Sequence, residues 1–125
     1  MTIAMTSVLV NDPIEAFKVY TEKLGFKERL YMPELYLAIV VSAEQPDGTG
    51  ILLEPTNNPI GKRHQVAVYE AGMPCIVFGA NDVQKEYERL KGLGFVFKKP
   101  PTKTEWGTEA VFDDTCGNFI QIWQP

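Results

Sequence analysis

Hydrophobic and polar residues follow two different periods along the chain, and the same succession of periods occurs twice. Short apolar runs at 8–10 and 76–80 are typical of β-strands. Each run is followed by an Asn-Asp pair and then by a segment with apolar residues three and four positions apart, the spacing of an amphipathic helix. Since aspartate is a favoured helix N-cap, we expect these helices to start at Asp12 and Asp82.

The two helical segments are copies of one another. Residues 11–26 and 81–95 both run from Asn-Asp, through a helix with a central tyrosine, to Leu-Gly-Phe, and the second copy is shorter by one residue. The copies start seventy residues apart and occur only twice, which is too long a repeat for a solenoid. The pattern therefore predicts two paired modules of one domain.

The rest of the pattern completes each module with further strands. Module one covers about 1–55, module two about 73–125, and residues 56–72 form a connection that favours a helix over 63–71. Strands are predicted at 2–10, 26–32, 35–42, 50–55, 73–80, 95–98, 108–112 and 119–123. Turns are predicted at 33–34, 45–48, 100–101 and 113–118.

Composition narrows the class of protein. The chain has 125 residues, 45% of them hydrophobic, which is enough for a real core. Its net charge of −4 argues against nucleic acid as a partner. The longest apolar run, 35–41, is too short to span a bilayer, and no basic head precedes an apolar core at the N-terminus. We expect a soluble cytoplasmic protein with no membrane partner, in which Cys75 and Cys116 are free thiols.

Several sequence features together resemble the vicinal oxygen chelate superfamily, which includes glyoxalase I, bleomycin and fosfomycin resistance proteins and extradiol dioxygenases. The features are the two strand-helix-strand copies, Leu-Glu-Pro at 53–55, and Asp-Asp-Thr-Cys-Gly-Asn-Phe-Ile-Gln-Ile at 113–122. The resemblance implies an α+β fold of two βαβββ modules, whose curled mixed sheets surround a cleft with the helices outside. It also implies a homodimer, and a divalent ion in the metalloenzyme members.

In this family the ion is held from the first and fourth strands of each module. The matching positions here are Met5, Glu54, Cys75 and Gln121, where the metalloenzymes place His or Gln, Glu, His and Glu. Only Glu54 is kept. Because thioether and amide groups do not join a carboxylate in a coherent set for a hard divalent ion, we expect no strongly bound metal. A weak ion on Glu54 and Gln121, with an ionised Cys75, is the alternative.

Two interpretations of the remaining side chains stay open. Met5 and Cys75 are expected to be ordinary packing residues, and Gln121 a polar residue of the cleft wall. Glu54 either lies at a rim, solvated or paired with a lysine, or binds a cationic or hydroxyl group of a ligand. In the second case it could also serve as a general base, which would make it a catalytic residue.

Strand alternation predicts which side chains share the cleft-facing side with these positions. They are Ser7, Leu52, Val77, Phe119 and Trp123, together with Glu54 and Gln121. Tyr36, Trp106 and Phe112 are further candidates whose register is open by one residue. The opposite side, toward the helices, receives Val8, Val10, Leu53, Ile76, Phe78, Ile120 and Ile122. A mostly apolar wall with a few polar anchors is typical of a small-molecule pocket, although plain core filling would give a similar pattern.

Three functions remain for such a chain. The first, which we favour, is a glyoxalase/bleomycin resistance-like protein that binds a small, partly aromatic molecule without a strongly bound metal. The second is a metal-dependent lyase, isomerase or dioxygenase with an atypical site around Glu54. The third is a structural or regulatory module without a ligand. The only histidine, His64, lies in a basic segment and is expected at the surface rather than beside a nucleophile.

Overall fold

The computed structural model describes all residues 1–125, which divide into two compact units, Met1–Arg63 and His64–Pro125. The division falls inside helix α2 (Pro59–Glu70) and therefore inside the segment predicted to connect the modules. The helix begins four residues before the predicted start at residue 63 and ends one residue before the predicted end. No helix in the chain is long and apolar enough to cross a membrane.

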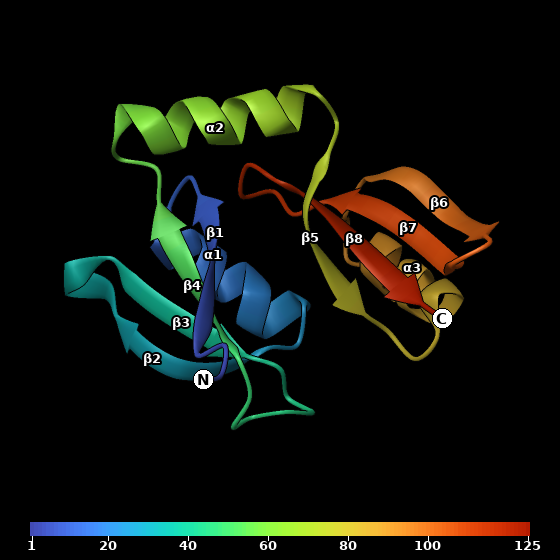
Figure 1. Cartoon of the computed structure of the whole chain (residues 1–125), viewed down its shortest axis with the longest axis horizontal. Coiled ribbons are helices and arrows are strands. Elements are labelled where there is room, and N and C mark those ends of the chain that lie inside the picture. The colour runs from blue at the N-terminus through green and yellow to red at the C-terminus, as the bar shows by residue number, and fades with distance from the viewer. The chain divides into compact units, whose positions relative to one another are not determined.

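The first unit is one βαβββ module (Figure 1). Its strand order is β1-β4-β3-β2, with β1 parallel to β4 and the other neighbours antiparallel. Its elements are β1 (Met5–Val10), α1 (Pro13–Lys18), the π-helical turn η1 (Val19–Lys23), β2 (Lys27–Met32), the 3₁₀ turn η2 (Pro33–Leu35), β3 (Leu37–Val41) and β4 (Gly50–Pro55).

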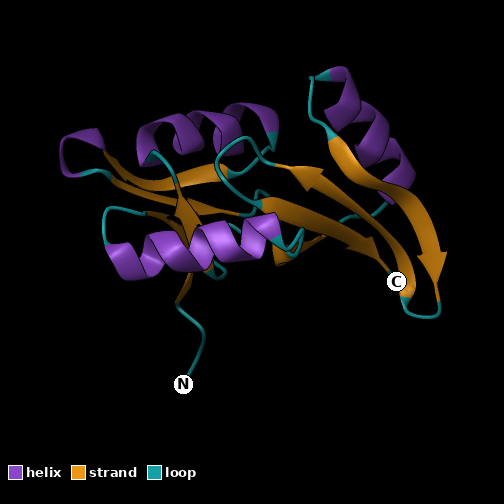
Figure 2. Cartoon of the chain, turned by 90° about the horizontal axis from the view of Figure 1, so that it is seen from above, coloured by secondary structure: helices purple, strands orange, loops and turns teal.

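The second unit repeats the same topology. Its strand order is β5-β8-β7-β6, again with the first and fourth strands parallel (Figure 1). Figure 2 distinguishes the helices from the strands in a second view. Its elements are β5 (Pro74–Gly79), α3 (Val83–Gly92), β6 (Phe97–Thr104), β7 (Gly107–Asp113) and β8 (Phe119–Gln124). The predicted α+β fold of two βαβββ modules with mixed sheets is therefore confirmed.

Both module helices begin where the sequence predicts, because an aspartate caps each of them. The Ile14 backbone N–H donates to Asp12 Oδ1 at 2.9 Å, and the Lys85 backbone N–H donates to Asp82 Oδ1 at 3.0 Å. In the first module the helix continues as η1, where the Leu24 N–H donates to the Val19 carbonyl, five residues back, at 3.0 Å. A π turn accommodates one extra residue, which accounts for the one-residue difference between the copies.

One face of each sheet forms the core beneath its helix. The buried positions there include Val8, Val10, Leu53, Ile120 and Ile122, all 4% exposed or less, as the alternation predicts. We call the opposite side of each sheet, where the other half of the alternation lies, the open face. Phe112 is 1% exposed and packs against Phe95 and Phe97, so it belongs to the core and not to the open face.

The prediction of a turn at residues 100–101 is wrong. Pro100 and Pro101 lie inside β6, which runs to Thr104 instead of ending at Lys98. Strand β6 is an edge strand, and its pairing with β7 shifts register between Lys99 and Thr102. Because a proline lacks the backbone N–H, an irregular edge strand is the place in a sheet that tolerates it.

Candidate functional site

Glu54, the only carboxylate among the predicted site residues, lies on the open face of the first sheet. Strand register places Met5 opposite Gly50, Ser7 opposite Leu52 and Leu9 opposite Glu54. Glu54 is half-buried, and its carboxylate makes no hydrogen bond or ion pair within the chain. Pairing with a lysine, one form of the rim interpretation, is therefore absent. Met5 is 46% exposed, so the expectation that it is a buried packing residue is wrong.

The two modules are not equivalent at the predicted ligand positions. In the second sheet Gln121 lies opposite Val77, and Trp123 lies opposite Gly79. Since Val77 is the counterpart of Ser7 in the duplication, the pairing makes Leu52 the counterpart of Gln121. By the same count Trp123 is the counterpart of Glu54. The polar residues Glu54 and Gln121 therefore occupy different positions along the strand pairs of their modules.

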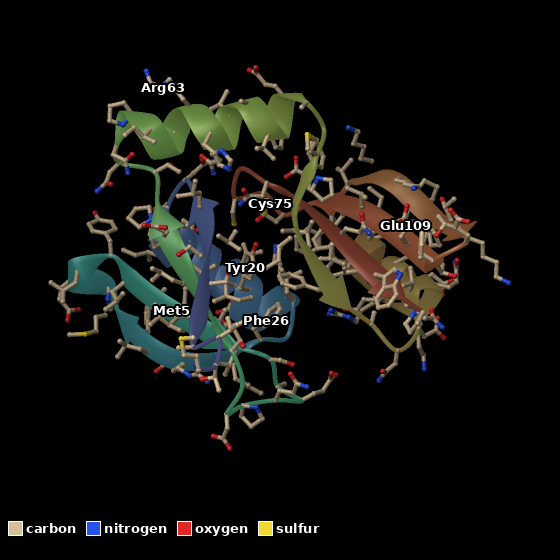
Figure 3. The ribbon with its side chains drawn as sticks, in the orientation of Figure 1. Met5, Tyr20, Phe26, Arg63, Cys75 and Glu109 are labelled. Carbon is tan, nitrogen blue, oxygen red and sulfur yellow. The ribbon has the colours of Figure 1, made fainter.

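Cys75 lies on β5, at the point where the pairing with β8 shifts register between Pro74 and Ile76 (Figure 3). The residue is exposed, which again departs from simple packing, and both cysteines are free. Although the residue as a whole is exposed, its sulfur is partly shielded from water, and this desolvation raises the pKa of Cys75 to about 11. The negative charge of Asp114 adds to the rise, and a backbone hydrogen bond opposes it. At neutral pH the sulfur therefore stays protonated, which makes it a poor nucleophile.

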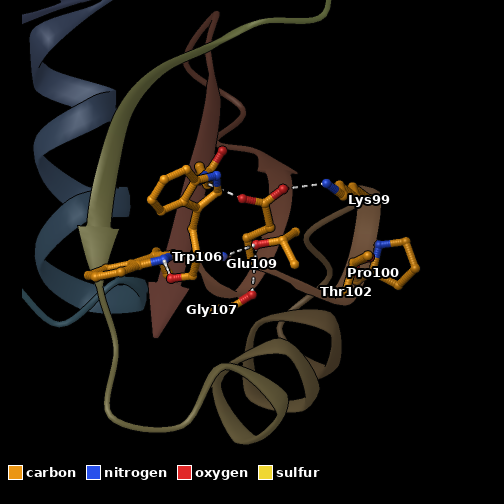
Figure 4. Close-up of polar contacts among 9 residues, drawn as sticks. Lys99, Pro100, Thr102, Trp106, Gly107 and Glu109 are labelled. Atoms are coloured by element: carbon orange, nitrogen blue, oxygen red, sulfur yellow. Dashed lines mark hydrogen bonds and ion pairs between the residues drawn. The ribbon is translucent and has the colours of Figure 1, made fainter. Parts of the chain in front are cut away.

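A chain of polar side chains crosses the open face of the second sheet (Figure 4). The Lys99 ammonium on β6 donates to Glu109 Oε1 on β7 and forms an ion pair with it. Gln121 Nε2 on β8 donates to Glu109 Oε2 at 3.2 Å. We call these three residues the Lys-Glu-Gln chain. Of the three, only Gln121 is predicted from the sequence; Lys99 and Glu109 lie on strands whose pairing the sequence pattern does not give.

An indole ring lies beside that chain. Trp123 is directly opposite Glu109 in the pairing of β7 with β8. Its Nε1–H donates to the Trp106 carbonyl at 3.1 Å, in the turn between β6 and β7. Gly107 follows with φ +132°, and a Cβ there would lie 2.2 Å from the Gln124 carbonyl oxygen. The Trp123 ring is thus held by a polar contact at its edge and by close packing of the turn.

Phe119 has the predicted face but is partly covered. The Tyr69 ring of α2 stacks on it with centroids 4.6 Å apart, and the Lys98 ammonium lies 5.1 Å from the Phe119 centroid. The Tyr69 hydroxyl donates to Asp113 Oδ2 at 2.5 Å, and this hydrogen bond to a carboxylate raises the pKa of Tyr69. One face of the Phe119 ring is therefore covered by Tyr69, whereas no aromatic ring stacks on Trp123.

The other aromatic candidates and the histidine lie at the surface. Trp106 is 76% exposed, and Tyr36 is 57% exposed with a left-handed backbone at φ +51°. His64 is exposed on α2, as predicted.

The donor set does not fit the divalent ion that the family holds. Met5 offers a thioether, Cys75 a thiol and Gln121 an amide, so Glu54 is the one charged oxygen ligand among the four positions. The chain contains no group of three or more His, Cys, Asp or Glu side chains arranged to hold a metal. Near Gln121 the carboxylate of Glu109 already has a cationic partner in Lys99.

Comparison with known proteins agrees with this fold. The sequence pattern of the Glyoxalase/Bleomycin resistance protein/Dioxygenase superfamily matches residues 2–122, and the chain belongs to that superfamily. The uncharacterised protein YurT of Bacillus subtilis (strain 168) is 48% identical over 126 residues, covering 99% of both chains.

Two solved structures share the architecture over nearly the whole length. UcmS2 superposes with a TM-score of 0.82 at 26% identity, covering 98% of this chain and 97% of that one. TnmS3, described as an antibiotic binding protein from Streptomyces sp. CB03234, superposes with a TM-score of 0.78 at 24% identity, covering 100% and 96%. At that identity the likeness to TnmS3 concerns the fold.

Proposed function

We propose that this protein binds a small, partly aromatic molecule on the open face of the second sheet, without a strongly bound metal. The proposal rests on the position of Trp123. This residue is paired with Glu109 across β7 and β8, and therefore lies beside the Lys-Glu-Gln chain. An aromatic surface with a few placed polar groups is the usual composition of a small-molecule site. The shared fold of TnmS3, whose description names antibiotic binding, supports the same class of function.

A metal-dependent enzyme centred on Glu54 is the second candidate. It is favoured by one observation: the Glu54 carboxylate is half-buried and has no partner within the chain. A carboxylate in that state gains from a cation or a hydroxyl group supplied by a ligand. The Met5 thioether of the same sheet, a soft ligand, counts against a hard divalent ion as that cation.

The binding proposal predicts that 2-naphthol, a flat aromatic probe, binds the wild-type protein in isothermal titration calorimetry at pH 7. Trp123→Ala should weaken this binding by at least about tenfold, because the stacking surface is lost. Trp106→Ala is the matched control, since it keeps the backbone carbonyl that holds Trp123 and should change the affinity little.

Elemental analysis of the same preparation separates the two candidate functions. We expect no stoichiometric Ni, Zn, Mn or Fe. Failure of 2-naphthol to bind, or equal loss in both tryptophan variants, would refute the binding site. A metal present at one ion per chain would support the enzyme instead.

We further infer that the protein is a homodimer, as the family resemblance implies. Sedimentation equilibrium at micromolar concentration should then give twice the chain mass of 14.0 kDa. A single species of 14.0 kDa would contradict this expectation.

A further inference from the structure

We propose that Lys99 and Glu109 make the site selective for the charge of the ligand. The site then binds a neutral aromatic molecule with a hydroxyl group more tightly than aromatic anions or cations. This inference rests on the proposed function, and it names the chemical class of the ligand and the residues that determine it. Neither residue belongs to the set of positions at which the family holds its ion.

The Lys-Glu-Gln chain spans three neighbouring strands. Lys99 lies opposite Val111, Val111 lies opposite Gln121, and Glu109 lies opposite Trp123. Lys99 and Gln121 donate to different oxygens of Glu109, so each carboxylate oxygen has one partner on the sheet. The side chains of Lys99 and Glu109 are 39% and 20% exposed, so a ligand can reach both.

Hydrogen-bonding capacity remains on each member of the chain. The ammonium of Lys99 has three N–H groups and donates one of them to Glu109. Each oxygen of Glu109 has a second lone pair that can accept a hydrogen bond. Trp123, by contrast, donates its only side-chain N–H to the Trp106 carbonyl. The indole therefore offers a π face, and the neighbouring Lys99 and Glu109 offer a donor and an acceptor side by side.

The charges of the pair decide which polar group fits there. A ligand carboxylate that approaches Lys99 also meets Glu109, and a ligand ammonium that approaches Glu109 also meets Lys99. In both cases repulsion from one member offsets attraction to the other. A hydroxyl group accepts a hydrogen bond from Lys99 and donates one to Glu109, so it gains from both members without a like-charge contact.

The test uses three probes with the same ring system: 2-naphthol, 2-naphthoate and protonated 2-naphthylmethylamine. Calorimetry at pH 7 and low ionic strength, where screening is weak, should show 2-naphthol binding the wild type at least about tenfold more tightly than either ion. Glu109→Gln removes the negative charge and should strengthen 2-naphthoate binding by about tenfold. Lys99→Met should do the same for the ammonium probe. Lys103→Met, at an exposed position of β6, is the control for a general charge effect.

The outcomes separate this inference from the function on which it rests. If 2-naphthol binds but neither variant changes the preference among the probes, charge selectivity is refuted and the binding function stands. If 2-naphthol does not bind the wild type, the proposed function fails as well. Circular dichroism checks that each variant is folded. Should Glu109→Gln unfold, the Lys99→Met result decides alone, because an unchanged preference there already contradicts the inference.

Discussion

Replacing Asp114 with alanine is expected to lower the free energy of unfolding by about 3–5 kcal/mol. Asp114 is fully buried in the turn between β7 and β8. Its Oδ1 accepts the backbone N–H groups of Cys116 at 2.7 Å and Asn118 at 3.0 Å, and its Oδ2 accepts the Asn118 side-chain amide at 3.1 Å. Alanine would leave these buried donors without an acceptor.

The measurement is urea denaturation of the wild type and two variants. Asp114→Asn keeps one carbonyl oxygen for the two backbone donors and should lose only about 1–2 kcal/mol. A loss below about 1 kcal/mol for Asp114→Ala would show that water or a rearranged turn replaces the carboxylate. The turn begins one position after β7, so a destabilised turn should also weaken 2-naphthol binding at the open face.

Tyr20→Ala is expected to cost about 3–5 kcal/mol of unfolding free energy. Tyr20 is fully buried in the first module, and its ring lies 5.9 Å from that of Phe26 (Figure 3). Its backbone carbonyl also accepts the Phe26 N–H at 3.0 Å, just beyond η1. Alanine would remove the largest fully buried side chain of the chain and leave a cavity beneath the sheet.

Urea denaturation again provides the measurement, with Tyr20→Phe as the matched control. Phenylalanine keeps the ring and removes only the hydroxyl, so a much smaller loss, about 1 kcal/mol, is expected. Equal losses for the two variants would show that the hydroxyl, and not the packing of the ring, accounts for the contribution of Tyr20. The first sheet would then depend less on this core than its burial indicates.

The pairing of Lys99 with Glu109 changes how the family scaffold is interpreted here. In the metalloenzyme members, according to the resemblance, His or Gln, Glu, His and Glu hold a divalent ion. In this chain the carboxylate that meets Gln121 comes from β7, and its cation is a lysine of the same sheet. An ammonium provides positive charge but no vacant coordination position, which is why we favour binding over metal-assisted chemistry.

The sequence by itself determined the duplicated fold and the two faces of each sheet. Asp12 and Asp82 cap their helices through contacts with residues two and three positions away, so the local sequence reveals where the helices start. The alternation of side chains is equally local, and it correctly placed Val8 and Ile120 toward the core. The family followed from these same short-range patterns.

Only the tertiary structure decided which polar side chains meet. Lys99 lies on the same face as Glu109 because β6 shifts register against β7 between Phe97 and Lys99, and Tyr69 covers Phe119 because its ring stacks there from α2. Register shifts depend on packing between strands, and one residue of slip reverses the face of every side chain. The alternation within one strand carries no information about such a register shift. The ion pair of Glu109 with Lys99 could therefore be found only in the folded sheet.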